Sequence, residues 1–263
     1  MTTIMLLTSV DLCPAGDGPG RSGFAFSAFV ALLVCLVCPL PALSGGHVFF
    51  DIGAGYKTGD FGTSIRTDLV HLTPVLGYAT PAYQCRVLVP LLVMVYTNDS
   101  ARQVRNGLGD IILQCGGTIL PERLWGLSVD GSLALKIPTA DKSDGFGTGK
   151  LDVGGFLGLQ QRIRMFKVRA SGGYIKIGSP PEVHYNDIYL YSVGLTWTVL
   201  ATDLAAGVQG RRSTVTGFPN PQEITAGVLR ALTESLAIRG SGFFGLNKGG
   251  PAFGLDVGIT KWF

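Results

Sequence analysis

The chain has 263 residues, a formal net charge of +3, 46% hydrophobic residues and only 15% charged ones. With 38 glycines as well, this composition is typical of a membrane-embedded or all-β protein and argues against an average soluble enzyme. Lysines and arginines are scattered singly, with no basic helix and no aromatic RNA-binding motif, which argues against nucleic-acid binding.

The N-terminal segment predicts a secretory signal peptide. Arg21 precedes the apolar stretch 24–40, and the triplet Ala42-Leu43-Ser44 supplies the small residues of a cleavage site. We therefore expect a signal peptide at 1–44, with an unusually extended start, and a mature domain at 45–263. An uncleaved membrane anchor or a later start codon is the alternative.

From Val48 onward, apolar residues recur with a period of two, which gives each strand one apolar and one polar face. In segment 127–137 the aliphatic side chains share one face, and Ser128, Asp130, Ser132 and Lys136 share the other. No mature segment supplies the roughly 20 apolar residues of a membrane helix. We expect twelve strands, at 48–57, 68–79, 83–96, 108–119, 124–138, 151–163, 166–177, 188–199, 203–212, 222–232, 235–245 and 251–263.

The connectors between these strands alternate in length. Those that follow the even strands are short, and the others are longer and rich in Gly, Pro, Asn and Asp. The longer set comprises 58–67, 97–107, 139–150, 178–187, 213–221 and 246–250. Short turns at one end, longer loops at the other and an even strand count predict a transmembrane, antiparallel, up-and-down β-barrel in the outer membrane of a Gram-negative cell.

The last predicted strand ends the chain on an aromatic residue. Stepping back by twos from Phe263, only Lys261 interrupts an apolar face that continues through Ile259, Val257 and Leu255. This spacing resembles the assembly signal of outer-membrane proteins, in which an aromatic usually stands where Lys261 does. The resemblance implies recognition by the barrel assembly machinery through this strand, and outer-membrane lipids are the other expected partner.

Cleavage after Ser44 would leave Cys85 and Cys115 in the mature protein, a pair that invites a disulfide in an exported protein. A hairpin centred near residue 102 would set the two cysteines about four residues out of register, which is roughly 13 Å along a strand. We therefore expect two free thiols on the apolar face.

The glycine-rich connector at 139–150 has some features of a phosphate-binding loop. A Walker loop needs a glycine where Asp144 stands and a hydroxyl where Leu151 stands. No buried parallel strand and helix flank it, so we expect a surface loop. Neither a metal nor another cofactor is predicted.

Two motifs resemble a known family. The segments "GLGD" at 107–110 and "KIPTADKSDGFGTGKLD" at 136–152 are similar to the paired signature of the phenol-degradation (meta-pathway) family of outer-membrane, transporter-like barrels, with Ala140 in place of the usual glycine. The resemblance implies passage of small compounds, including aromatic or hydrophobic ones. For Asp110 and Asp152 the sequence leaves two readings open, a cap or ion pair at the rim and a solute contact.

Parity along the strands assigns a set of charged side chains to the inner face of the barrel. The expected pore-lining residues are Arg86, Asp130, Lys136, Asp152, Arg162, Lys167, Arg169, Arg211 and Arg239, and Asp51, Lys57, Asp110, Asp203 and Asp256 share their face. Near balance of charge favours ion pairs across the lumen as much as a selective pore. A basic patch would select anions if Arg162, Lys167, Arg169, Arg211 and Arg239 met at one constriction.

These patterns predict a porin-like channel for passive passage of small solutes. Twelve strands enclose a narrow lumen, which an inward-folded loop would plug in part. A non-conducting structural or ligand-binding barrel is the first alternative, and a lipid-modifying enzyme is the second. Because no nucleophile motif surrounds His47, His71 or His184, we do not expect an enzyme.

Overall fold

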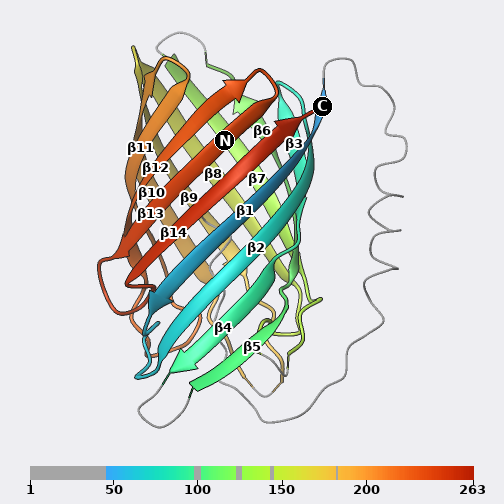
Figure 1. The fold of residues 1–263 in the computed structure, drawn as a ribbon, viewed down its shortest axis with the longest axis vertical. Coiled ribbons are helices and arrows are strands. Elements are labelled where there is room, and N and C mark those ends of the chain that lie inside the picture. The colour runs from blue at the N-terminus through green and yellow to red at the C-terminus, as the bar shows by residue number, and fades with distance from the viewer. Residues whose placement is uncertain (1–45, 98–101, 123–125, 143–144, 182) are drawn as a thin grey trace.

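The computed structural model describes residues 46–97, 102–122, 126–142, 145–181 and 183–263. The expected signal peptide and its cleavage after Ser44 lie outside these ranges. Within them the chain is all-β and forms one antiparallel sheet that closes into a barrel (Figure 1). Its segments are β1 (His47–Gly59), β2 (Arg66–Ala79), β3 (Tyr83–Leu88), β4 (Leu91–Thr97), β5 (Arg102–Leu108), β6 (Ile111–Leu120), β7 (Leu127–Ile137), β8 (Asp152–Ile163), β9 (Phe166–Lys176), β10 (Ile188–Val199), β11 (Thr202–Arg211), β12 (Gln222–Thr233), β13 (Leu236–Gly245) and β14 (Phe253–Trp262).

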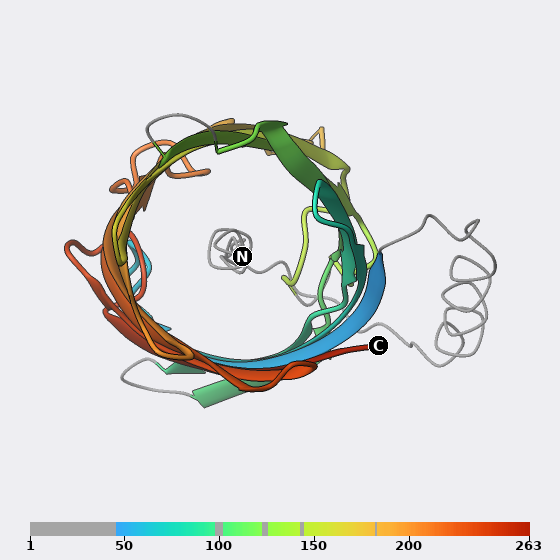
Figure 2. The same cartoon turned by 90° about the horizontal axis from the view of Figure 1, so that it is seen from above.

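The ring closes between the first and last strands. β1 pairs with β14 on one side and with β2 on the other, and the view down the axis shows an unbroken wall (Figure 2). Both β3 and β4 pair with β2, while β5 pairs with β4 and β6 pairs with β3. These four segments are therefore the halves of two interrupted strands, and the barrel has twelve strands as predicted.

The interruptions fall where two expected strand boundaries were wrong. The predicted strand 83–96 is broken at Val89 and Pro90, since proline has no N–H to give to a ladder. The predicted connector 97–107 is mostly strand, because β4 runs to Thr97 and β5 already begins at Arg102. The remaining connectors follow the predicted alternation between short turns at one end and longer loops at the other, except that the β6–β7 connector, 121–126, is as long as the β1–β2 loop, 60–65.

The two faces of the sheet differ as the period of two requires. Leu133, Leu157 and Tyr189 point away from the axis and are 61–69% exposed, which suits a surface that faces hydrocarbon. Aromatic pairs lie towards both edges of this surface: Phe166 with Trp197 beside the short turns, and Phe244 with Phe253 beside the longer loops. No helix within the described ranges is long and apolar enough to cross a membrane.

The final strand behaves as its sequence predicts. Leu255, Val257 and Ile259 are exposed on the outer face of β14. The Nζ atom of Lys261 donates a hydrogen bond to the Ser235 hydroxyl at 2.7 Å, at the turn between β12 and β13. The lysine is thus accommodated at the rim of the barrel, where its ammonium group reaches polar partners.

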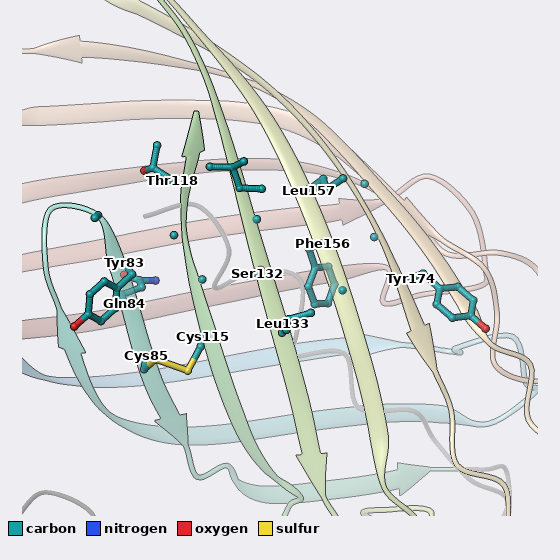
Figure 3. A pocket seen from close by; sticks show the side chains of 18 residues that line it. Tyr83, Gln84, Cys85, Cys115, Thr118, Ser132, Leu133, Phe156, Leu157 and Tyr174 are labelled. Carbon is teal, nitrogen blue, oxygen red and sulfur yellow. A yellow bond between two sulfur atoms is a disulfide. The ribbon is translucent and has the colours of Figure 1, made fainter. Parts of the chain in front are cut away.

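The two mature cysteines form a disulfide, so the prediction of free thiols was wrong. Cys85 of β3 lies directly opposite Cys115 of β6, with a Cα–Cα distance of 4.1 Å. The expected offset came from a hairpin centred near residue 102, whereas the observed chain reverses between Thr97 and Arg102. The disulfide lies at the edge of a shallow hollow of about 910 Å³ on the outer wall, between Tyr83 and Tyr174 (Figure 3).

Candidate functional site

The interior of the barrel contains a cavity of about 250 Å³ whose wall carries charged, polar and apolar groups. Strands β1 to β3 and β8 to β14 contribute to its wall. The charged side chains at its wall are Lys167, Arg169, Asp203, Arg239 and Asp256, together with His71. Val75 and Leu88 add apolar wall, so that the cavity offers both charge and carbon to a molecule inside it.

Several of the inward charges pair across an intervening strand. The Nε2 atom of His71 on β2 lies 2.7 Å from Asp256 on β14, with β1 between them. Gly55 of β1 stands opposite both residues, and a Cβ atom there would lie only 2.0 Å from the Asp256 carboxylate. Glycine at this position therefore leaves the space in which the two side chains meet.

The same arrangement recurs on the opposite wall. Arg169 of β9 donates two hydrogen bonds of 2.6 Å to Asp130 of β7, passing over Gly158 of β8. A Cβ atom on Gly158 would lie 2.3 Å from the guanidinium. The planar fork of arginine matches the carboxylate in this bidentate contact, which fixes the orientation of both groups.

A third such pair joins β1 to β13. Arg239 contacts Asp51 over Gly258 of β14, and the Thr260 hydroxyl donates to the same carboxylate at 2.6 Å. Asp51 is only 2% exposed, so its charge requires these partners. Three glycines thus allow three pairs of side chains to meet across an intervening strand, and two of these are arginine–aspartate ion pairs.

The two motifs that resemble the phenol-degradation family meet at the end of the barrel that carries the longer loops. The ammonium group of Lys136 lies 3.2 Å from Asp110 and 2.6 Å from Asp152. The Ala140 amide donates to Asp110 at 3.0 Å, and the Gly178 amide donates to Asp152 at 2.8 Å. Both aspartates therefore act here as partners of a lysine and of loop amides.

The expected basic patch does not assemble at one level. Lys167, Arg169 and Arg239 line the central cavity. Arg162 instead lies near the short turns, where it pairs with Glu122 and is half-exposed, whereas Arg211 ends β11 at the opposite end of the barrel.

The remaining two members of the predicted set also have polar neighbours. Arg86 donates hydrogen bonds of 2.9 and 2.5 Å to Gln114 across the β3–β6 ladder. Lys167 lies 3.7 Å from Asp203, one strand beyond its neighbour β10. The lumen therefore presents paired charges of both signs along its length.

An apolar cluster inside the barrel was not predicted. Leu69, Leu92 and Met94 point inward and are at most 3% exposed, and Phe146 of the β7–β8 connector packs against them. The connector can be followed inside the wall in Figure 2. The signal in the sequence was the apolar run Val87 to Val95, in which consecutive rather than alternate residues are apolar, so one of its faces had to point inward.

His71 occupies a polar niche within the wall. Its Nε2 atom faces Asp256, and its Nδ1 atom lies 3.4 Å from the Thr73 hydroxyl. Within the described ranges, no three His, Cys, Asp or Glu side chains are grouped as a metal site would need. His71 thus contacts Asp256 across β1.

A closed, twelve-stranded antiparallel barrel with an aliphatic outer face, aromatic edges and a polar interior has the fold of an outer-membrane β-barrel. No family model matches the chain, and no curated protein matches it. The fold is similar to that of the COG4313 outer membrane channel from Pseudomonas putida F1, with a TM-score of 0.69 and 16% identity over 84% of this chain and 97% of that one.

Autotransporter barrels are also similar in fold. The translocator domain of NalP from Neisseria meningitidis gives a TM-score of 0.50 and 12% identity over 90% of this chain and 94% of that chain. The transport unit of AIDA-I from Escherichia coli gives a TM-score of 0.51 and 11% identity over 90% of this chain and 97% of that chain. At these identities the comparisons define the fold.

Proposed function

We propose that the protein is a passive channel for small solutes, with aromatic and other apolar compounds among them. The observation that carries this proposal is the interior itself, where a cavity of about 250 Å³ joins fixed charge pairs to apolar wall at Val75 and Leu88. The fold shared with a COG4313 outer membrane channel supports the same function. Domain 45–263 forms this channel, and residues 1–44 direct its export.

The predicted pore-lining residues take two roles in this proposal. Lys167, Arg169 and Arg239 form the polar wall that a solute passes at the level of the cavity. Lys136 and Asp152 hold the inward connector at the loop-bearing end. Because Lys136, Arg169 and Arg239 already have carboxylate partners, they bind a passing ion less strongly, which favours flow over retention.

Reconstitution tests the proposal directly. The purified protein in planar bilayers should give single-channel conductance, and liposome swelling should admit small sugars, phenols and aromatic acids with a sharp limit in size. A panel of graded solutes locates that limit. Absence of both conductance and swelling would favour a non-conducting structural or ligand-binding barrel.

A further inference from the structure

A second hollow, of about 300 Å³, lies on the inner wall of the barrel towards the short turns. It is formed by β3, β6, β7 and β8, together with Arg169 of β9 and the turn between β2 and β3. Gln160 and Arg169 also line the central cavity, so the two spaces adjoin. The volume of the hollow is at the lower end of the range of about 300–1,000 Å³ that is usual for small-molecule sites.

The inward side chains of this hollow are mainly amides and hydroxyls. They project from four neighbouring strands and are Gln84, Gln114, Thr118, Ser128, Ser132 and Gln160. Each amide offers both donors and an acceptor, and each hydroxyl can act as either. Within the described ranges, the side chains of Gln84, Ser128 and Gln160 have no hydrogen-bond partner. The hollow therefore presents hydrogen-bonding groups that are available to a solute.

Gln114 is held with its NH₂ group turned away from Arg86. Its side chain is buried, and its Oε1 atom accepts hydrogen bonds of 2.9 and 2.5 Å from Arg86. Because a guanidinium group can only donate, the amide oxygen faces Arg86 and the NH₂ group faces the hollow. The Nε2 atom lies 3.5 Å from the Ser132 hydroxyl, beyond the usual range of about 2.7–3.2 Å for such a bond. A buried donor is thus oriented into the hollow and only weakly used by the protein.

The charged residues in the wall of the hollow cancel each other. Arg169 donates to both carboxylate oxygens of Asp130 at 2.6 Å, so this pair adds no net charge. A charged solute would lose water here without gaining an unpaired counterion from that wall. An uncharged solute with several hydroxyls instead exchanges its hydrogen bonds with water for hydrogen bonds with the amides and hydroxyls. The chemistry of the hollow therefore favours the uncharged solute.

We propose that this hollow is a binding site in the lumen for uncharged, polyhydroxylated solutes such as monosaccharides. As a statement about what the barrel carries, the inference rests on the proposed channel function and names a further class of solute for it. The central cavity offers apolar wall at Val75 and Leu88, whereas the hollow offers donors and acceptors beside it. A hydroxylated solute would meet this site between the centre of the barrel and the short turns.

The test measures binding and passage separately. Saturation-transfer NMR on the purified protein in detergent detects weak binding of D-glucose, and planar bilayers detect the fall in ion current while glucose occupies the lumen. Glucose should bind and should reduce the current in a saturable way. Triethylene glycol, which is of similar size but has hydroxyls only at its ends, should have far less effect. D-glucuronate, which carries a carboxylate, should bind more weakly than glucose.

Amide-to-leucine variants locate the site. Gln160→Leu and Gln84→Leu each remove an amide with little change in volume, and each should raise the glucose concentration for half-maximal block about fivefold. Gln209→Leu is the matched control, because Gln209 is also an inward, partly buried glutamine but lies on β11, where it donates to Glu223 at 2.9 Å. Folding is checked by heat-dependent migration in gels, and either amide variant that folds carries the test.

The outcomes separate the binding site from the channel. If the protein conducts but glucose neither binds nor blocks, the channel stands and the site is overturned. If the protein does not conduct but binds glucose, and Gln160→Leu weakens that binding, the channel fails and the site stands in a ligand-binding barrel. Absence of both conductance and binding removes both. Equal weakening by Gln209→Leu would overturn the location of the site, and tighter binding of glucuronate than of glucose would overturn its class of solute.

Discussion

Two regions of the barrel hold their strands together in different ways. From β8 to β14 the strands pair along nearly their whole length, and the interior is braced by side chains that meet over glycines, as Arg239 and Asp51 do over Gly258. From β3 to β7 the ladders are interrupted, and the wall is held by a disulfide on its outer face and, inside, by a lysine with two carboxylates and an inserted connector.

The difference shows how local irregularity is compensated. Leu88 pairs with Ile112 and Leu91 pairs with Leu108, so 109–111 contain one residue more than 89–90 opposite them. Where Pro90 and this extra residue interrupt the ladder, the chain adds a disulfide and ionic links within neighbouring strands. In the regular region the ladders run along nearly the whole length of the strands, and the ionic links add to pairing that is already in place. Equivalent changes should therefore lower the free energy of unfolding more in the interrupted region than in the regular one.

Removal of the Lys136 charge should have the largest effect. Lys136→Met leaves Asp110 and Asp152, each about 5% exposed or less, without their shared counterion, and should lower the free energy of unfolding by about 3–5 kcal/mol. Urea unfolding in detergent micelles measures this change in the free energy of unfolding. Lys167→Met in the regular region removes a single, more exposed pair and should cost less than about 1 kcal/mol. Equal losses in the two variants would remove the distinction between the regions.

Loss of the disulfide should come next. The bond closes a loop across a sequence separation of 30, and its removal in Cys85→Ala/Cys115→Ala should lower the free energy of unfolding by about 3–4 kcal/mol through chain entropy. The control is Ser171→Ala/Ser192→Ala, which removes a directly opposed hydrogen-bonded pair between β9 and β10. That change should cost only about 1 kcal/mol. A disulfide variant as stable as the serine variant would contradict the compensation argument.

A side chain on a bridging glycine tests the contacts that pass over glycines. In Gly55→Ala the new methyl group would overlap both Asp256 and His71, so the pair must separate, at an expected cost of about 1–3 kcal/mol. Gly172→Ala provides the comparison, since its nearest neighbour is the Leu190 carbonyl at 3.7 Å. The temperature of thermal unfolding should be clearly lower for Gly55→Ala than for Gly172→Ala. The reverse order would show that the space above Gly55 has no structural role.

The smallest effect concerns the outer loops of the regular region. The Tyr174 hydroxyl, the Ile177 amide and Lys176 all contact Asp187 and lower the pKa of its carboxyl group. Because the folded pKa is depressed, this carboxylate stabilises the fold at neutral pH, and its contribution is lost as the pH falls through that lowered pKa. Unfolding should be measured at a series of pH values from neutral into the acid range. The free energy of unfolding of Asp187→Asn should be lower than that of the unaltered protein at neutral pH and equal to it in acid. A gap that persists in acid would assign the effect to packing.

The sequence predicted the barrel well because alternation is a local property. Residues an odd number of positions apart on a strand, such as Leu133 and Lys136, lie on opposite faces of the sheet, and the positions of Gly, Pro and Asn mark the turns. The candidate site was predicted in part for the same reason. Parity brought Arg169, Arg239 and Asp256 to the inner face, but it could not say which charges meet, since those contacts skip a strand and depend on glycines in between.

The inward apolar cluster shows a second limit. Parity treats one face of each strand as lipid-facing, so an apolar run on both faces, as in Val87 to Val95, has no assigned partner. Only the fold reveals that Phe146 reaches this surface from a connector some fifty residues further along the chain.

By itself, the amino-acid sequence determined the period of two, the count of twelve strands, the sorting of short and long connectors and the apolar face that ends at Phe263. Each of these follows from residues that are neighbours in the chain. The tertiary structure decided the register of β3 against β6, and with it the Cys85–Cys115 bond, and which side chains meet over glycines. Register depends on one unpaired residue near Gly109, and shifting a strand by a single residue changes every contact that it makes without altering its pattern.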